Sequence, residues 1–291
     1  VYAGVSEIEL EYSVGCCGGS GRNFLFAGET IEIGTCDSPP SPPPPSPSPP
    51  SPSPSPPYSG SIQPSVPPPS PGILQLGVEA YVKAPNAGSS DTFGSSVALS
   101  GDTLAVGAYY EGSCSTAVST TAATDDDCSY AGAAYVYTRS GTTWSFEAYI
   151  KAPNAEGWDI FGSSVALSGD TLAVGAYGEG SCSTGVSTSA AIDNGCISAG
   201  AVYVYARSGT AWSFEAYVKA PNAESGDNFG RSIALSGDTL AVGAYGEGSC
   251  STGVSTSAAT DNGCNSAGAV YVYARSGTTW SFEAYVKAPN A

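Results

Sequence analysis

The sequence of 291 residues contains no histidine and no methionine, and only nine lysine and arginine residues against 26 aspartate and glutamate residues. Without histidine, Ser-His-Asp and Cys-His catalytic groups cannot form, so we expect no enzyme of these classes. The formal charge of −17 repels phosphate, and we expect no nucleic-acid partner. Apolar runs stay well short of the roughly 20 residues that a membrane-spanning helix needs, so no membrane insertion is expected.

Nucleotide-binding loops are missing as well, because the sequence has neither a Gly-x-x-x-x-Gly-Lys-Ser/Thr motif nor a Gly-x-Gly-x-x-Gly motif that opens a helix. Carboxylates that could act as catalytic pairs recur once per repeat copy, whereas a catalytic site is normally built once. We therefore predict that the protein is not an enzyme. The chain begins at Val1 without a leader pattern, which indicates a processed or partial chain and leaves its compartment open.

Proline divides the chain into segments. Eighteen of the 22 prolines lie between Pro39 and Pro71, and the other four, Pro85, Pro153, Pro221 and Pro289, are spaced 68 residues apart. This distribution predicts a small N-terminal β module at 1–37, a Ser/Pro-rich linker at 38–72 and a repeat region at 73–291.

The repeat region contains three copies of 68 residues, at 83–150, 151–218 and 219–286, and the second and third copies differ at eight positions. A fixed period of this length indicates one supersecondary unit repeated in tandem, each copy burying its faces against its neighbours.

Within a copy, apolar residues alternate with a period of two, which is typical of strands rather than helices. In the second copy, the alternation and the turns at 168–170 and 207–210 predict four strands in two hairpins. Strands that are apolar on both sides suit a sheet packed between identical sheets, as in a β-propeller blade. In the last strand, we expect one face to carry Trp212, Phe214, Ala216 and Val218 and the other to carry Glu215, Tyr217 and Lys219.

The segments 161–176 (Phe-Gly-Ser-Ser-Val-Ala-Leu-Ser-Gly-Asp-Thr-Leu-Ala-Val-Gly-Ala) and 199–205 (Ala-Gly-Ala-Val-Tyr-Val-Tyr) resemble the FG-GAP repeat family. The resemblance covers about residues 77–291. It implies an all-β fold of propeller blades like those of integrin α chains, in a secreted or cell-surface protein. Members often carry an Asp-x-Asp-x-Asp-Gly calcium loop. That spacing is missing here, so we expect no cofactor, and the remaining calcium candidate is Asp125, Asp126 and Asp127.

Three copies are fewer than the roughly four to eight blades that close a propeller. Residues 77–85 read as an additional fourth-type strand, but the last copy already has its own fourth strand before Ala291. We therefore expect an open array. Either further blades follow Ala291, or the exposed faces and edges meet another subunit.

Six of the nine cysteines form pairs 14 residues apart, one pair in each copy. Neither Cys-x-x-Cys pairs nor histidine partners accompany them, so disulfides are a better interpretation than metal ligands. Disulfides imply an oxidising compartment and an extracellular location. The predicted pairs are Cys114–Cys128, Cys182–Cys196 and Cys250–Cys264.

Three cysteines remain, Cys16, Cys17 and Cys36. Adjacent cysteines do not readily bond to each other, so one of Cys16 and Cys17 is expected to pair with Cys36. The other stays buried or bridges to another chain. Residues 1–37 alternate between apolar and acidic residues but cannot bury a core alone, which predicts either a disulfide-stapled β module or a strand that pairs with a neighbouring subunit.

Residues 39–57 consist of proline and serine, and this composition predicts an extended polyproline II rod. It serves either as a stiff spacer or as a ligand for proline-binding domains. The runs of Ser-Pro and Ser-Pro-Pro-Pro-Pro also resemble hydroxyproline-rich glycoproteins of algal and plant cell walls. That resemblance implies hydroxylation and O-glycosylation at Pro39, Pro40, Pro42, Pro43, Pro44, Pro45, Pro47, Pro49, Pro50, Pro52, Pro54, Pro56 and Pro57.

These features predict a structural subunit of an extracellular glycoprotein fibre, appendage or cell-wall layer. Its expected partners are copies of itself in a homopolymer and covalent O-glycans. The alternative is a cell-surface adhesion or ligand-binding protein that uses the loops of an FG-GAP propeller.

Overall fold

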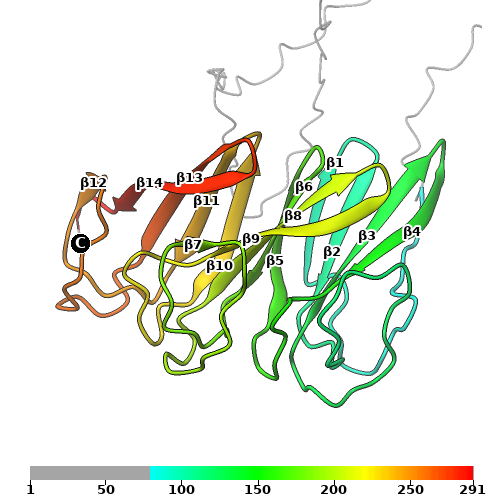
Figure 1. Ribbon diagram of the computed structural model, residues 1–291, viewed down its shortest axis with the longest axis horizontal. Helices are drawn as coiled ribbons and strands as arrows, with labels where there is room; N and C mark the ends of the chain where they lie inside the picture. Colours follow the sequence, from blue (N-terminus) through cyan, green and yellow to red (C-terminus); the bar gives the residue numbers. More distant parts are fainter. Residues whose placement is uncertain (1–78, 291) are drawn as a thin grey trace, which may run out of the picture. The chain divides into compact units, whose positions relative to one another are not determined.

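The computed structural model describes residues 79–290, which form three antiparallel sheets and contain no helix (Figure 1). Each sheet corresponds to one repeat copy. The first sheet has the strand order β1-β2-β3-β4, with β1 (Ser96–Ser100), β2 (Thr103–Ala108), β3 (Ala133–Ser140) and β4 (Thr143–Ile150).

The second and third sheets each contain a short fifth strand at their outer edge. The second has the order β5-β6-β8-β9-β7, with β5 (Phe161–Ser168), β6 (Thr171–Ala176), β8 (Ala201–Ser208), β9 (Ala211–Val218) and β7 (Val186–Ser187). The third has the order β10-β11-β13-β14-β12, with β10 (Phe229–Ser236), β11 (Thr239–Ala244), β13 (Ala269–Ser276), β14 (Thr279–Lys287) and β12 (Gly253–Ser255). The four predicted strands per copy are confirmed, and the fifth was not predicted.

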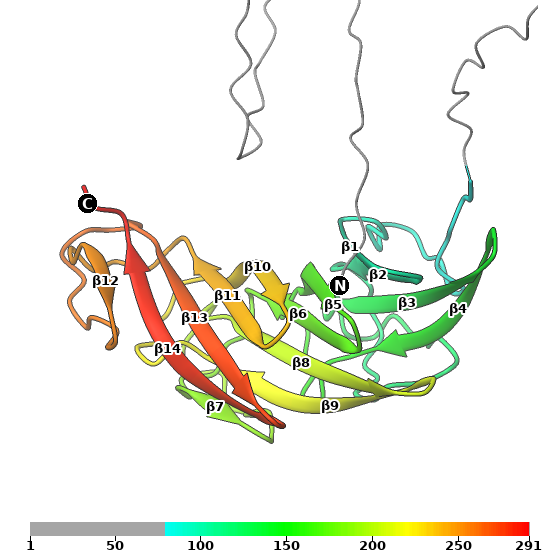
Figure 2. The same ribbon diagram turned by 90° about the horizontal axis from the view of Figure 1, so that it is seen from above.

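The sheets stand beside one another like blades. Seen from above, the first strands β1, β5 and β10 lie close together, and the last long strands β4, β9 and β14 lie on the outside (Figure 2). The three described sheets make an open array and no closed barrel. The all-β, blade-type architecture predicted from the repeat is therefore confirmed for this part of the chain.

Both faces of the second sheet are buried, which explains why its strands are apolar on both sides. Tyr203 and Tyr205 point toward the first sheet, while Val202 and Val204 pack against the third. All four side chains are completely buried. The alternation along a strand thus supplies one residue to each of two neighbouring interfaces.

The expected faces of the last long strand are wrong beyond Phe214. A β-bulge at Glu215 shifts the register, so that Tyr205 pairs with Phe214 while Val204 pairs with Ala216. A bulge inserts one unpaired residue and moves the following side chains to opposite faces. Trp212, Phe214 and Tyr217 therefore pack toward the first sheet, and Ala216 and Val218 pack toward the third.

The strand predicted at 77–85 is also wrong in its described part, because residues 79–85 form no strand. A fourth-type strand needs the third strand of the same blade as its partner, and no such strand precedes it among the described residues. The expectations for residues 1–37 and 38–72, including those for Cys16, Cys17, Cys36 and the prolines at 39–57, lie outside the described residues. Within 79–290, no helix is long and apolar enough to span a membrane.

Candidate functional site: the joints between sheets

Successive sheets approach most closely at the Phe-Gly pair that opens β5 and β10. Ser96 Oγ donates a hydrogen bond of 2.8 Å to the carbonyl oxygen of Gly162, and a Cβ atom added to Gly107 would lie 2.0 Å from the same oxygen. Backbone atoms at this distance leave no room for a side chain, so glycine is required at position 107. The joint is fixed by backbone contact and not by side-chain packing alone.

The next joint repeats this geometry. Ser164 Oγ donates to the carbonyl oxygen of Gly230 at 2.7 Å, and a Cβ atom on Gly175 would lie 2.1 Å from that oxygen. The amide of Phe229 also donates to the carbonyl of Ala199 at 3.1 Å, which adds a parallel bridge between the sheets. Two consecutive joints with the same contacts show that this is the standard way in which the sheets dock.

A second contact lies nearer the outside of the array. Glu147, on β4 of the first sheet, accepts a hydrogen bond of 2.7 Å from Trp212 Nε1 and pairs with Arg207 at 3.5 Å. Glu215 on β9 makes the same contacts with Trp280 and Arg275 of the third sheet. The acidic residue at the bulge of β4 and the one at the bulge of β9 therefore each hold the following sheet.

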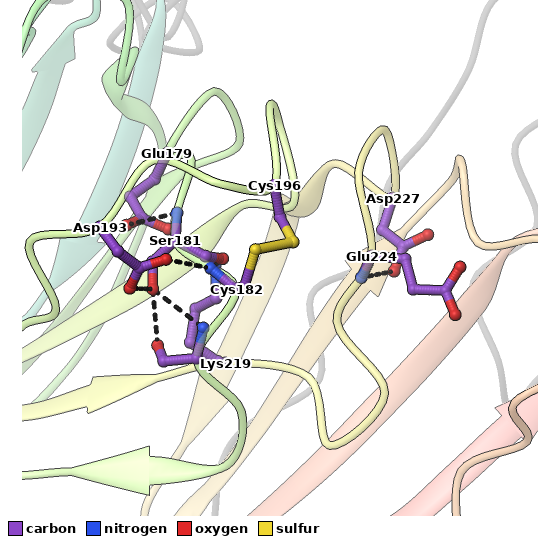
Figure 3. The surroundings of a disulfide bond; sticks show 9 residues. Glu179, Ser181, Cys182, Asp193, Cys196, Lys219, Glu224 and Asp227 are labelled. Carbon is purple, nitrogen blue, oxygen red and sulfur yellow. Dashed lines mark hydrogen bonds and ion pairs between the residues drawn. A yellow bond between two sulfur atoms is a disulfide. The ribbon is translucent and has the colours of Figure 1, made fainter.

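Each sheet also contains a buried ion pair at its loop end, and Figure 3 shows the pair of the second sheet. Lys219 Nζ lies 2.7 Å from Glu179 Oε2 and donates to the carbonyl oxygen of Ser181 at 2.8 Å. Burial lowers the pKa of Lys219, and the attraction of Glu179 opposes that shift. The corresponding pairs are Lys151–Glu111 and Lys287–Glu247.

The pentapeptide Lys-Ala-Pro-Asn-Ala links one sheet to the next. Its lysine closes the sheet that ends there, as Lys151 does on Glu111. Its asparagine belongs to the following sheet, because Asn154 Nδ2 donates to the carbonyl of Ala191 at 2.7 Å and its Oδ1 accepts from the hydroxyl of Tyr203. This division of contacts explains why the five residues recur together at every joint.

The three predicted cysteine pairs are disulfides in the structure, and each closes a loop at this end of its sheet. In the second sheet, Asp193 accepts a hydrogen bond of 2.8 Å from the amide of Cys182 and one of 2.7 Å from Ser181 Oγ (Figure 3). These donors lower the pKa of Asp193. The same two positions bind Asp125 in the first sheet, through Cys114 and Ser113.

The hydrogen bonds within the loop give Asp125 a structural role, although it is one of the three aspartates that the sequence offered as calcium ligands. Both carboxylate oxygens of Asp125 accept hydrogen bonds within the loop, while Asp126 lines a separate groove. Within 79–290, no group of three or more acidic or cysteine side chains lies close enough together to hold a metal ion. The structure thus does not assemble Asp125, Asp126 and Asp127 into one site.

Two buried carboxylates next to the joints were missed by sequence reasoning. Asp159 accepts a hydrogen bond of 2.9 Å from the amide of Glu156, and burial raises its pKa to about 7. Asp227 accepts from the amide of Glu224, and burial raises its pKa to about 6 (Figure 3). The available signal was their position, since an aspartate stands two residues before the Phe-Gly pair in every copy.

These joints carry the residues by which the repeat is recognised. The model of the FG-GAP repeat matches residues 77–137, 144–205 and 212–273. The chain belongs to the FG-GAP repeat family. The second and third matched segments each run from the fourth strand of one blade into the third strand of the next, so each of these two units includes one joint between sheets. No match was found among curated proteins.

FG-GAP membership and the three disulfides together are consistent with a cell-surface or extracellular β-repeat protein. The family fold is of the repeat and adhesion type and not that of an enzyme. The sites that the described residues build are accordingly surfaces and joints between blades.

Proposed function

We propose that the protein is a structural subunit of an extracellular glycoprotein fibre, appendage or cell-wall layer, and that its copies associate end to end. The outer face of the third sheet in one copy docks on the outer face of the first sheet in the next. The observation that carries this proposal is that both outer faces repeat the surfaces that the two internal joints bury.

The outer face of the first sheet is apolar and only partly covered: residues 82–84 pack against its buried tyrosines, whereas its surface at β1 is exposed. Val97 and Leu99 are 64% and 63% exposed, whereas Val165 and Leu167, at the same positions of the second sheet, are each 8% exposed. Removing apolar surface of this kind from water lowers the free energy, which favours association. Val165 and Leu167 are covered by the face of the preceding blade, so the same kind of face would cover Val97 and Leu99.

The outer face of the third sheet offers that surface. Val270 is 40% exposed, while Val202 at the same position of the second sheet is completely buried. A hollow beside it is lined by Ser232, Gly243 and Gly268, the counterparts of the residues that contact the Phe-Gly pair at the internal joints. In a docked pair, Ser232 Oγ would donate to the carbonyl oxygen of Gly94 of the next copy, as Ser96 does to Gly162.

The segment 79–87 adds a way to close such a joint. Its sequence, Glu-Ala-Tyr-Val-Lys-Ala-Pro-Asn-Ala, is identical to residues 283–291. Lys83 is exposed, whereas Lys151, Lys219 and Lys287 at the same position are buried against glutamates. Because the two segments are interchangeable, one of them would occupy the fourth-strand position of a shared joint and the other would be released. This is an exchange of identical elements between subunits.

The Ser/Pro segment at 38–72 belongs to the proposal as a spacer that carries O-linked sugar. Mass spectrometry of residues 39–57 tests this part separately, because hydroxylation and glycosylation add mass to individual prolines. Unmodified prolines throughout that segment would remove the cell-wall assignment and leave the assembly proposal in place.

Sedimentation velocity on the full chain tests the assembly. We expect wild-type protein to form species of increasing mass as its concentration rises. Gly243→Ala blocks the face of the third sheet, and Leu99→Asp blocks the face of the first, so each variant alone should be monomeric. Their equimolar mixture should form only a dimer, because each variant retains one working face. Ile192→Asp, on an exposed loop, is the control and should assemble like wild type.

Two results would overturn the proposal: a wild-type chain that stays monomeric at every concentration, or variants that assemble like wild type.

A second candidate function, a cell-surface adhesin that binds a ligand with its loops, is favoured by an exposed row of aromatic rings at the loop end of the first sheet. The same sedimentation experiment separates the two, since an adhesin needs no association between copies.

A further inference from the structure

Four aromatic rings form a continuous row among the loops of the first sheet and the loop that leads to the second. The rings of Tyr109 and Tyr110 have centroids 4.2 Å apart, those of Tyr110 and Tyr130 are 4.3 Å apart, and those of Tyr130 and Trp158 are 4.3 Å apart. Trp158 is 65% exposed and Tyr110 is 37% exposed. Large rings are usually buried, so a row of them that remains in contact with water needs an explanation.

The fold of the blade does not explain the row. Residues that the blade needs, such as Lys151 and Lys219, recur in every copy. The ring positions do not, because three of the four aromatic residues are replaced by small residues elsewhere. Tyr110 corresponds to Gly178 and Gly246, Tyr130 to Ser198 and Ser266, and Trp158 to Gly226 and Ser90.

Two of the rings sit on an unfavourable backbone conformation. Tyr130 and Trp158 have φ angles of 62° and 73°, in the left-handed region, and the third copy has Gly226 with a φ of 85° at the position of Trp158. Ser90, Ser198 and Ser266 at the equivalent positions share this conformation, so the loop itself sets it, and a bulky ring there adds strain that the small residues avoid. The second copy thus has tryptophan, the largest side chain, at a position where the third copy has glycine.

A polar groove runs beside the rings. Tyr110 and Tyr130 line it together with Asp91, Asp126 and Ser129. No lysine or arginine is among the residues that line this groove. It therefore offers flat apolar surfaces and hydrogen-bond acceptors, but no positive charge.

We infer that this row and groove form a binding site for a neutral saccharide. A sugar ring presents an apolar C–H face that can stack on a Tyr or Trp ring and hydroxyl groups that can donate to carboxylates. Acidic or sulfated sugars would meet Asp91 and Asp126 without a compensating cation. A Ser-Pro peptide would also stack on the rings, but its prolines have no N–H, so it offers the carboxylates fewer donors than a sugar does. The inference does not depend on the assembly proposed above.

The test begins with the full chain on an array that carries neutral, acidic and sulfated oligosaccharides together with Ser-Pro peptides. The best neutral oligosaccharide is then titrated against the protein by isothermal titration calorimetry, a readout that does not depend on Trp158. The variants are Tyr110→Gly, Tyr130→Ser and Trp158→Gly, each of which introduces a residue that another copy already carries at that position. The control is Ile192→Thr, which copies Thr260 of the third repeat at an exposed site that does not line the groove.

We expect binding to neutral oligosaccharides only. Each ring variant should weaken it about fivefold to tenfold, and the three together should abolish it. Unchanged melting temperatures would show that the variants fold, and Ile192→Thr should bind like wild type. The inference is wrong if no neutral oligosaccharide binds, if only acidic sugars or Ser-Pro peptides bind, or if the triple variant binds as tightly as wild type.

Discussion

Lys219 and Glu179 are 40 residues apart in the sequence, yet Lys219 Nζ lies 2.7 Å from Glu179 Oε2 and the two side chains are 0% and 2% exposed. The pair ties the end of β9 to the loop that follows β6. It therefore fixes the open end of the blade, where the disulfide loop begins. The equivalent pairs in the first and third sheets give the repeat three identical buried contacts.

Removing one partner of this pair should be costly. Glu179→Leu leaves the ammonium group of Lys219 buried without a countercharge, and we expect the free energy of unfolding to fall by about 3–5 kcal/mol. The double variant Glu179→Leu/Lys219→Met should recover most of that loss. Urea unfolding followed by circular dichroism measures both. The control is Lys83→Met, at the exposed copy of the same position, which should change stability by less than about 0.5 kcal/mol. Equal effects of Lys83→Met and Glu179→Leu would contradict the assignment.

Asp159 makes stability depend on pH. Burial is the main reason why its pKa rises to about 7. The hydrogen bond from the amide of Glu156 and the charge of Lys151 oppose the rise, while the carboxylates of Glu179 and Glu156 add to it. A carboxyl group with a raised pKa in the folded state stabilises the fold below the unfolded pKa of about 3.9, and this contribution is lost as the pH rises through 7. Asp227, with a pKa raised to about 6, acts in the same direction. We expect the repeat region to unfold at lower urea concentration at pH 8 than at pH 5.

The variant Asp159→Asn tests whether Asp159 causes the slope of stability against pH between pH 5 and pH 8. The amide oxygen of asparagine can still accept the hydrogen bond from Glu156, but the side chain does not ionise. The difference between pH 5 and pH 8 should therefore shrink in Asp159→Asn. Asp127→Asn removes an exposed acid from a loop and serves as the control, with an unchanged slope. A slope in Asp159→Asn that equals that of the wild type would exclude Asp159 as its source.

The strands could be predicted from the sequence because their signals are local. Period-two alternation, the Ser-Gly-Asp turn and the fixed repeat length identify β5, β6, β8 and β9 with their partners. The bulge at Glu215 could not be predicted in this way, since the residue looks like one more polar position in an alternating strand. The short strands β7 and β12 were also missed, because two or three residues in a Ser/Thr-rich loop carry no periodic signal.

The joints were harder to predict because their contacts link residues far apart in the chain. The two cysteines of each copy are 14 residues apart, and this regular spacing was sufficient to predict the three disulfides. The pairing of Lys219 with Glu179 shows the same regularity at a separation of 40, but many acids compete for each lysine in a sequence of this charge. The row from Tyr109 to Trp158 could not be predicted from the repeat, because it consists mainly of residues in which the copies differ.

The glycines at the joints should respond differently to the same substitution. A Cβ atom on Gly175 would lie 2.1 Å from the carbonyl oxygen of Gly230, a backbone atom that cannot move without separating the sheets. We expect Gly175→Ala to lower the free energy of unfolding by about 1–3 kcal/mol. Gly243→Ala meets the hydroxyl of Ser232, which can rotate away, so its effect on stability should be within about 0.5 kcal/mol. Thermal melts of the two variants side by side measure the contrast, and equal losses would show that the joint does not set the requirement for glycine.

The disulfide at Cys182–Cys196 should stabilise the second blade mainly by restricting its unfolded loop. For a loop closed by cysteines 14 residues apart, the chain-entropy model gives about 3 kcal/mol. We expect the double variant Cys182→Ser/Cys196→Ser to lose about this much free energy of unfolding, and so to unfold at a lower urea concentration. Loss of the disulfide should also loosen the cap that Asp193 forms on the amide of Cys182, which hydrogen exchange at that amide would detect. The equivalent variant Cys250→Ser/Cys264→Ser is the matched comparison in the third blade. In the third blade, Asp261 accepts the equivalent hydrogen bonds from Ser249 Oγ and the amide of Cys250. If both variants unfold like wild type, then the hydrogen bonds of Asp193 and Asp261 hold these loops without the disulfides, and the oxidising compartment is not needed for the fold.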